Sequence, residues 1–234
     1  MIESQNTREE RLIFKLFIKK NRKNLVDLFE SEILEAIIKN AEECYIDMLE
    51  YMPIIDQRAP FHSELRYYSH FLALAKAAEK YGDNVQKIGS LIIKDAQDNI
   101  NQKTEQEIKD ERRKWFSVEK ENYKQTALYS QERKYSDDWI YYYIECEDGK
   151  YDFGLDFTKC AIWDFFKKMD GQALIPYVCY TDFIWSEGLG LGLKRTKTLV
   201  TEDDRCNLRW KNGAATQSCS ILTSLVEKEN FNDR

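Results

Sequence analysis

The hydrophobic pattern changes near Tyr135, and this change constrains the fold more than any other feature of the sequence. Before this point apolar residues recur at three- and four-residue spacing, as in the run from Leu25 to Met52, and this spacing predicts helices. After it, "WIYYYIEC" is rich in aromatic and β-branched residues, which favours a strand. Asp148 and Gly149 separate this run from "YDFGLDF", and such a pair predicts a two-residue hairpin turn.

The pairing of Glu147 with Lys150 across this turn predicts which residues share a face of the hairpin. The first face is expected to be apolar and to belong to the core: Ile140, Tyr142, Ile144, Cys146, Tyr151, Phe153, Leu155 and Phe157. The second face is expected to meet solvent or a ligand: Trp139, Tyr141, Tyr143, Asp152, Gly154 and Asp156.

Further helices are expected on both sides of the first hairpin. In the first half, Ser63 is the expected N-cap of a helix that ends at Gly82, and another helix covers 85–99. The charged run 101–127 is either an exposed helix or a catalytic cluster, and its mixed charges favour the helix. In the second half, one helix ends at Gly171 and the next runs from Pro176 to Gly188.

A second hairpin is expected after these helices, with "LKRTKTLV" and "RCNLRWK" on either side of a polar "TEDD" turn. The fold class is therefore α+β. A helical region, 1–130, packs on an antiparallel unit, 131–213, which consists of a hairpin, two helices and a hairpin. The tail, 214–234, has no clear pattern.

Charge and length limit the classes of partner. The net charge of −6 argues against a nucleic-acid binder, because phosphates are neutralised by clustered Lys and Arg. No apolar run is long enough to span a bilayer, and the first residues lack the apolar core of a signal peptide. We therefore expect a cytoplasmic protein with a small-molecule partner, no nucleic acid and no membrane. A homodimer is left open.

Cysteine and histidine spacing argues against a metal centre. The six cysteines contain no CxxC pair, so no structural zinc site is expected. A Cys-His or Ser-His-Asp centre would have to use His62 or His70, because the sequence has no other histidine.

The helix that begins at Pro176 carries the most unusual polar residue. Cys179, Asp182, Phe183 and Ser186 fall on one helical face, and the helix is otherwise apolar almost all round. We expect Asp182 to be buried, and a buried carboxylate must be paired, hydrogen-bonded or protonated. A structural acid and a functional acid both fit this pattern.

Strand alternation places Arg195 on the same face of the last hairpin as Cys206. Among apolar neighbours, Arg195 either stacks on Trp210 or binds a carboxylate, unless its strand is an exposed edge. Cys160 and Cys179 lie near expected helix starts, where the helix dipole lowers the pKa of a thiol. The alternative is that both are small core residues.

Residues 151–210 resemble the C-terminal half of the L-2-amino-thiazoline-4-carboxylic acid hydrolase family. Four short motifs carry the resemblance: Gly154, Asp156 and Cys160; Pro176, Cys179 and Asp182; Leu193, Arg195, Thr196, Thr198 and Leu199; and "CNLR" from Cys206 to Arg209. The family has "CDFR" at the last motif and a glycine-rich turn before it, whereas this chain has Asn207 and "TEDD". The cysteine-rich ending is also similar to the 4-vinyl reductase ligand-binding domain.

The first resemblance implies a hydrolase without a cofactor that opens a cyclic amidine or thiazoline amino acid to an N-carbamoyl amino acid. It implies catalytic roles for Cys160, Cys179 and Asp182, with Asp182 as base or amidine anchor. It implies that Arg195, Cys206 and Ser186 bind the substrate, with Arg195 on its carboxylate. The second resemblance implies a module that binds a small molecule without turnover. In either case we expect these residues to meet in one pocket.

Overall fold

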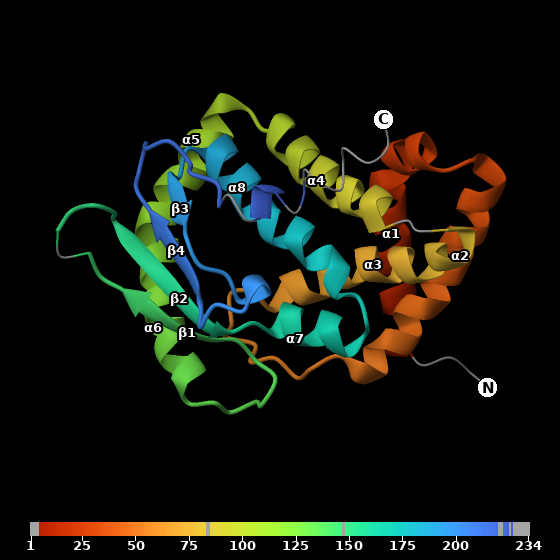
Figure 1. The fold of residues 1–234 in the computed structure, drawn as a ribbon, viewed down its shortest axis with the longest axis horizontal. Coiled ribbons are helices and arrows are strands. Elements are labelled where there is room, and N and C mark those ends of the chain that lie inside the picture. Colours follow the sequence, from red (N-terminus) through yellow and green to blue (C-terminus); the bar gives the residue numbers. More distant parts are fainter. Residues whose placement is uncertain (1–4, 83–84, 147, 220–221, 225, 227–234) are drawn as a thin grey trace.

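The computed structural model describes residues 5–82, 85–146, 148–219, 222–224 and 226. The first four helices lie on one side of the molecule, the sheet lies on the other, and α7 and α8 lie between them (Figure 1). The first helices are α1 (Gln5–Leu28), α2 (Ser31–Met48), α3 (His62–Ala78) and α4 (Val85–Asn101). Helix α2 packs on α3, and α4 packs on α8, so the helical region reaches the second half directly.

The helical first half is confirmed, but two of its predicted details are wrong. The run from Leu25 to Met52 is not one helix, because the chain turns between Leu28 and Ser31. This turn lets α1 fold back on α2, so that Phe14 and Leu34 are both fully buried. The N-cap of α3 is Phe61 rather than Ser63, and no side chain caps this helix.

The charged run forms an exposed helix, as its mixed charges predict. It consists of α5 (Glu105–Lys114), a π-helical segment (Trp115–Glu119) and α6 (Lys120–Gln131). No residue of α5 is buried, and Thr104 caps it in a reciprocal pair of hydrogen bonds with Glu107. The π-helical segment brings Trp115 to the sheet, where its ring centroid lies 5.4 Å from that of Trp210.

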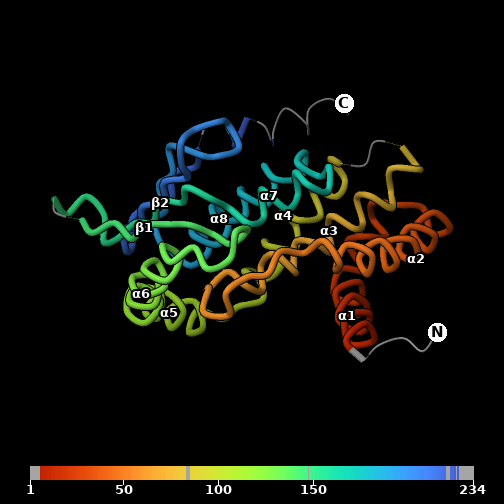
Figure 2. The backbone as a smooth tube through the Cα atoms, turned by 90° about the horizontal axis from the view of Figure 1, so that it is seen from below, coloured from red at the N-terminus to blue at the C-terminus, as the bar shows by residue number. Residues whose placement is uncertain are grey.

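The second half is the predicted antiparallel unit of hairpin, two helices and hairpin. Its strands are β1 (Ile140–Ile144), β2 (Phe153–Lys159), β3 (Leu193–Arg195) and β4 (Cys206–Trp210), in the order β1-β2-β4-β3. Helices α7 (Ala161–Lys168) and α8 (Ile175–Leu189) connect the two hairpins. Figure 2 shows α5 and α6 together on one side of this sheet, with α7 and α8 beyond its end. The α+β class is therefore confirmed.

The predicted register of the first hairpin is wrong by one residue. Tyr141 lies opposite Phe157 and Tyr143 opposite Leu155. The paired strands end at Ile144 and begin again at Phe153, so the pairing does not extend to Lys150, and Glu147 lies outside the described residues. A slip of one residue turns β1 over, so Tyr141 is buried and Tyr142 is exposed. Helix α6 selects this register, because the Tyr141 hydroxyl donates a 2.7 Å hydrogen bond to Thr126.

The predicted alternation of the second hairpin is confirmed. Leu193 lies opposite Trp210 and Arg195 opposite Leu208, and all four side chains are buried on the inner face of the sheet. The strand β3 is shorter than expected, because a 3-10 turn (Leu199–Thr201) follows soon after it.

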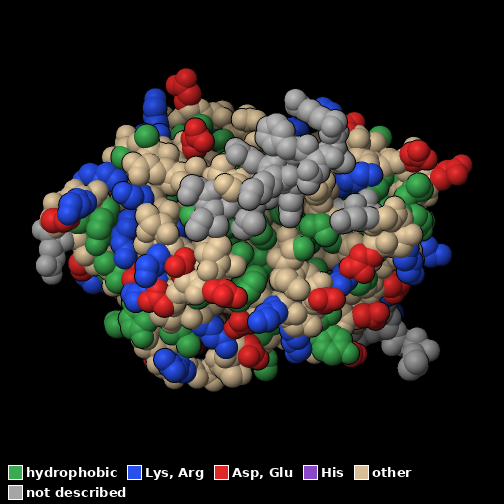
Figure 3. Space-filling view, viewed as in Figure 1, with side chains coloured by type: hydrophobic (Ala, Val, Ile, Leu, Met, Phe, Trp, Pro, Cys, Tyr) green, Lys and Arg blue, Asp and Glu red, His purple; other side chains and the backbone are tan. Residues whose placement is uncertain are grey.

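Beyond the sheet, the backbone N–H of Gln217 bonds to the carbonyl of Leu193 at 2.7 Å, and Leu222 is fully buried. The rest of the tail, from 227, lies outside the described residues. Among the residues described here, no helix combines the length and apolar character that a membrane crossing requires. Acidic and basic side chains are intermingled on the face seen in Figure 3.

Candidate functional site

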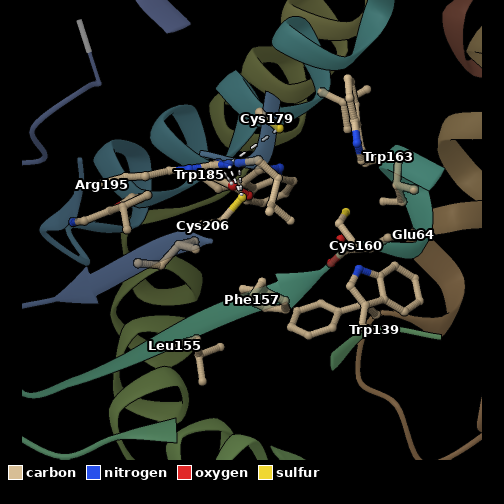
Figure 4. A pocket seen from close by; sticks show the side chains of 18 of the residues that line it. Glu64, Trp139, Leu155, Phe157, Cys160, Trp163, Cys179, Trp185, Arg195 and Cys206 are labelled. Carbon is tan, nitrogen blue, oxygen red and sulfur yellow. Dashed lines mark hydrogen bonds and ion pairs between the residues drawn. The ribbon is translucent and has the colours of Figure 1, made fainter. Parts of the chain in front are cut away.

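A cavity of about 310 Å³ lies between α3, α7, α8 and the inner face of the sheet. All six site residues that the sequence singled out line it: Cys160, Cys179, Asp182, Ser186, Arg195 and Cys206. Their convergence comes from four elements, because Cys160 precedes α7, three residues belong to α8, Arg195 ends β3 and Cys206 begins β4. Figure 4 shows Arg195, Cys179 and Cys206 gathered at one place in the cavity wall. The roles of these residues remain predictions.

Arg195 is the centre of this polar group, and its side chain is only 2% exposed. Its nitrogen atoms donate to five protein acceptors: Asp182 Oδ2 at 3.1 Å, Thr198 Oγ1 at 2.8 Å, Cys206 Sγ at 3.0 Å, Cys179 Sγ at 3.8 Å and the carbonyl of Lys197 at 3.4 Å. A planar guanidinium with so many partners is held rigidly. Most of the N–H donors of Arg195 are therefore used within the protein, and few are left to bind a substrate carboxylate.

Asp182 faces the cavity rather than the core. Its side chain keeps 45% of its surface exposed, so the expectation of a buried acid is wrong. The reason is that α8 packs its other faces against the protein and leaves this one along the cavity. The surrounding protein displaces hydration water and raises the pKa of Asp182, and the charge of Arg195 opposes this shift.

Glu64 is a second acid in the cavity, and the sequence did not reveal it. It lies in the first turn of α3, where an acid is unremarkable in sequence terms. Its side chain is exposed, although the wall of the cavity that it lines displaces part of its hydration water. This loss of hydration, together with the charge of Asp182, raises the pKa of Glu64 to about 8. This shift favours the protonated form of Glu64.

The mouth of the cavity lies beside these two acids. A second hollow, of about 550 Å³, shares four of the lining residues: Glu64, Tyr68, Asp182 and Trp185. The Tyr68 and Thr181 hydroxyls lie 2.8 Å apart and join α3 to α8 at this place. A ligand that enters here meets the carboxyl groups first and the sheet last.

The two thiols near helix starts are not activated. Burial raises the pKa of Cys179 to about 12, although the charge of Arg195 opposes the shift. Burial also raises the pKa of Cys160 far above its usual range. Desolvation thus outweighs the helix dipole that the sequence suggested would lower the pKa of both thiols.

Cys206 differs from the other thiols in its hydrogen bonds. Its sulfur accepts from Nη2 of Arg195 at 3.0 Å and from the backbone N–H of Leu199 at 3.3 Å. Ser186, in contrast, is used for structure, since its hydroxyl accepts from the backbone N–H of Leu193 at 2.8 Å and joins α8 to β3.

The rest of the cavity wall is aromatic. All five tryptophans of the chain line it: Trp115, Trp139, Trp163, Trp185 and Trp210. Phe61, Tyr68, Tyr123 and Phe157 add further rings. The indole nitrogen of Trp115 is buried and has no hydrogen-bond partner among the described residues. Strand alternation places Trp139 on a face expected to meet solvent or a ligand, and Trp210 on the face of Arg195. It says nothing of Trp115, Trp163 and Trp185, which belong to helical segments.

Asn207, which stands where the family has an acid, is not among the residues that line the cavity. Its side-chain oxygen accepts from the backbone N–H groups of Thr196 at 2.9 Å and Lys197 at 2.6 Å. An aspartate would accept the same two bonds. The asparagine therefore leaves the polar groups of the cavity unchanged, and it does not distinguish an enzyme from a binding module.

Neither histidine completes a catalytic centre with a residue of this cavity. His70 is buried among Phe14, Phe17 and Tyr45, and burial lowers the pKa of His70 to about 4. His62 lies at the start of α3 and does not line the cavity. Among the described residues, no three His, Cys, Asp or Glu side chains are grouped so as to hold a metal ion.

A family model described as L-2-amino-thiazoline-4-carboxylic acid hydrolase matches residues 61–210. The matched range contains every residue that lines the cavity, from Phe61 to Trp210. No curated protein and no solved structure matches the chain.

Proposed function

Because this chain belongs to the L-2-amino-thiazoline-4-carboxylic acid hydrolase family, we propose that it opens the ring of a small cyclic amidine or thiazoline amino acid by hydrolysis. Water adds to the ring carbon between sulfur and nitrogen, the carbon–sulfur bond breaks, and the product is an N-carbamoyl amino acid with a free thiol. The observation that supports this proposal most directly is the pair of cavity acids, Asp182 and Glu64, which differ in their surroundings.

The two acids divide the proton transfers between them. Asp182 is held by Arg195, which favours its ionised form, and it accepts a proton from the attacking water. The raised pKa of Glu64 favours its protonated form, which donates a proton to the departing sulfur. Carboxyl groups in different environments commonly divide acid and base roles in this way. Asp182 thus takes up the proton of the attacking water, and Glu64 supplies the proton of the departing sulfur. These two proton transfers need no cofactor.

The thiols have lesser roles in this route. Cys160 and Cys179 keep their protons and form part of the wall. Arg195 positions Asp182 and Cys206, and Ser186 holds α8 against β3. If the reaction passes through a covalent intermediate, Cys206 is the thiol whose surroundings suit a nucleophile, because two N–H groups are directed at its sulfur.

A panel of thiazoline and cyclic amide substrates, assayed for release of thiol and for the N-carbamoyl product, tests the proposal. We expect ring opening of at least one cyclic amidine and none of the matching saturated cyclic amides. The aromatic wall also favours a second function, binding of a small molecule without turnover. Quenching of tryptophan fluorescence across the panel with no product formed would support that function and reject the hydrolase.

A further inference from the structure

The cavity is larger and more apolar than a thiazoline amino acid requires. Its volume is about 310 Å³, and a cavity of roughly 150 Å³ already accommodates benzene. There is thus room for two ring-sized groups. The wall consists mainly of aromatic and aliphatic side chains, and the polar groups are gathered on α3, α8 and the neighbouring ends of β3 and β4.

The strand β4 runs from the polar end of the cavity, at Cys206, to its aromatic end, at Trp210. Its length therefore gives the distance between the two ends. Cys206, Leu208 and Trp210 point into the cavity from alternate positions of this strand. Four residues at about 3.3 Å each separate Cys206 from Trp210 by about 13 Å. A single five-membered ring that reacts beside Cys206 and Asp182 cannot also reach Trp210. The aromatic end therefore has no contact with such a ring.

The aromatic end has the features of a binding surface. The Trp115 ring lies 5.4 Å from the ring centroids of both Tyr123 and Trp210, and the three line the cavity together. A π-helical segment, a rare element that is frequent at functional sites, brings Trp115 there. Its unpartnered indole N–H is a second sign that this end is completed by a ligand, because an unsatisfied buried donor is unfavourable.

Among the residues that line the cavity, no unpaired cation is available to bind a substrate carboxylate. Its ionisable side chains besides cysteine and tyrosine are Glu64, Asp182 and Arg195. Arg195 is the cation among these lining residues, and its side chain is 2% exposed and bound to Asp182. A free carboxylate on the substrate would therefore have to compete with Asp182 for Arg195.

We infer that the substrate of this site is a cyclic amidine that carries an uncharged, ring-sized apolar substituent in place of a free carboxylate. This inference rests on the proposed function for the amidine ring, while the substituent is deduced from the aromatic end. The amidine lies at the mouth beside Glu64 and Asp182, and the substituent packs against the cavity-facing surfaces of Trp115, Tyr123 and Trp210.

Three ligands separate the effect of charge from the effect of size: 2-amino-thiazoline-4-carboxylate, its N-methyl amide and its N-benzyl amide. Their dissociation constants are measured by calorimetry on the full-length protein, and ring opening is assayed in parallel. We expect the benzyl amide to bind at least about tenfold more tightly than the methyl amide, since it buries a whole ring. We expect the acid to bind no better than the methyl amide. Tightest binding by the acid, or equal binding by the two amides, would overturn the inference.

Two variants of the protein test where the substituent of the ligand binds. Trp115→Ala should remove the advantage of the benzyl amide and change the affinity for the methyl amide by less than about twofold. Tyr142→Ala, at an exposed position on the outer face of β1, is the control and should change neither. If Trp115→Ala fails to fold, the comparison of the three ligands on the unmodified protein still decides the question.

The outcomes for the two proposals are distinguishable. Ring opening of the acid, with no binding of the benzyl amide, would preserve the proposed hydrolase and reject the apolar substituent. Tight binding of the benzyl amide without opening of any of the three rings would preserve the apolar substituent and reject the proposed hydrolase.

Discussion

At the scale of single residues, the proposed mechanism depends on the contact between Asp182 and Arg195. Asp182→Asn keeps the shape of the side chain and removes its charge, so it should reduce turnover by about 100-fold or more with little change in melting temperature. Steady-state kinetics beside a melting curve measure both. Glu187→Gln, on an exposed face of the same helix, is the matched control and should retain activity. Near-normal activity of Asp182→Asn would make Asp182 a structural residue.

Arg195 is expected to act mainly through its protein partners. A lysine offers one point charge where the guanidinium reaches five acceptors, so Arg195→Lys should lower the free energy of unfolding by about 2 kcal/mol. Denaturant unfolding measures this change. Arg113→Lys, at an arginine whose side chain is 77% exposed, should change it by less than about 0.5 kcal/mol. A raised KM with unchanged stability would instead show that Arg195 binds the substrate directly, as the sequence suggested.

Glu64 makes stability depend on pH. Its pKa is raised to about 8 from an ordinary value of 4.5, so in this window the folded chain holds a proton that the unfolded chain has lost. The contribution of Glu64 to stability therefore falls as pH rises from about 4.5 to 8. Glu64→Gln removes this fall, so the melting temperature of the variant relative to the unmodified protein should rise between pH 5 and pH 9. Parallel curves across that range would show that the carboxyl is not perturbed.

At the scale of elements, the packing of α4 on α8 positions Asp182. A Cβ atom at Gly89 would lie 2.4 Å from Cζ of Tyr177, which is fully buried. Gly89→Ala gains about 1 kcal/mol in helix propensity, but overpacking of this kind costs about 1 to 3 kcal/mol. Because the Tyr177 ring is fully buried, we expect a net loss of stability and a lower turnover as α8 shifts. Chemical denaturation and kinetics measure the two effects.

Gln97→Ala, on the exposed face of the same helix, is the control for this contact. It should leave both stability and turnover nearly unchanged. A stabilised Gly89→Ala would mean that Tyr177 can move aside and that the α4–α8 contact does not position the site.

The two hairpins show where a prediction of strand faces from the local sequence pattern succeeds and where it fails. Alternation in "LKR" and "CNLRW" correctly placed Arg195 and Cys206 on the inner face, because both residues lie in strands with one apolar face. The same reasoning failed for β1, since three consecutive tyrosines suit either face of a sheet. There the choice is made by α6, whose Thr126 binds Tyr141 and whose Gln131 donates to the carbonyl of Tyr141 at 2.6 Å.

At the scale of the whole molecule, the helical region and the sheet share one continuous hydrophobic core, from Phe14 to Trp210. We therefore expect a single cooperative transition in calorimetry, with equal calorimetric and van't Hoff enthalpies. Two separated transitions would instead support a boundary near residue 130 between independently stable parts. The Tyr142→Ala variant provides the control, because it should not change the number of transitions.

The sequence by itself determined the secondary structure of most of this chain and the face on which Arg195, Cys206 and Asp182 lie. It did so because periodicity and capping are local properties that neighbouring residues impose on one another. Only the tertiary structure decided what covers each face. It brought Glu64 from α3 beside Asp182 from α8, placed tryptophans from five separate segments around one cavity, and surrounded Arg195 with five acceptors. The pKa values of these groups follow from that enclosure, because desolvation depends on atoms that are distant in the sequence.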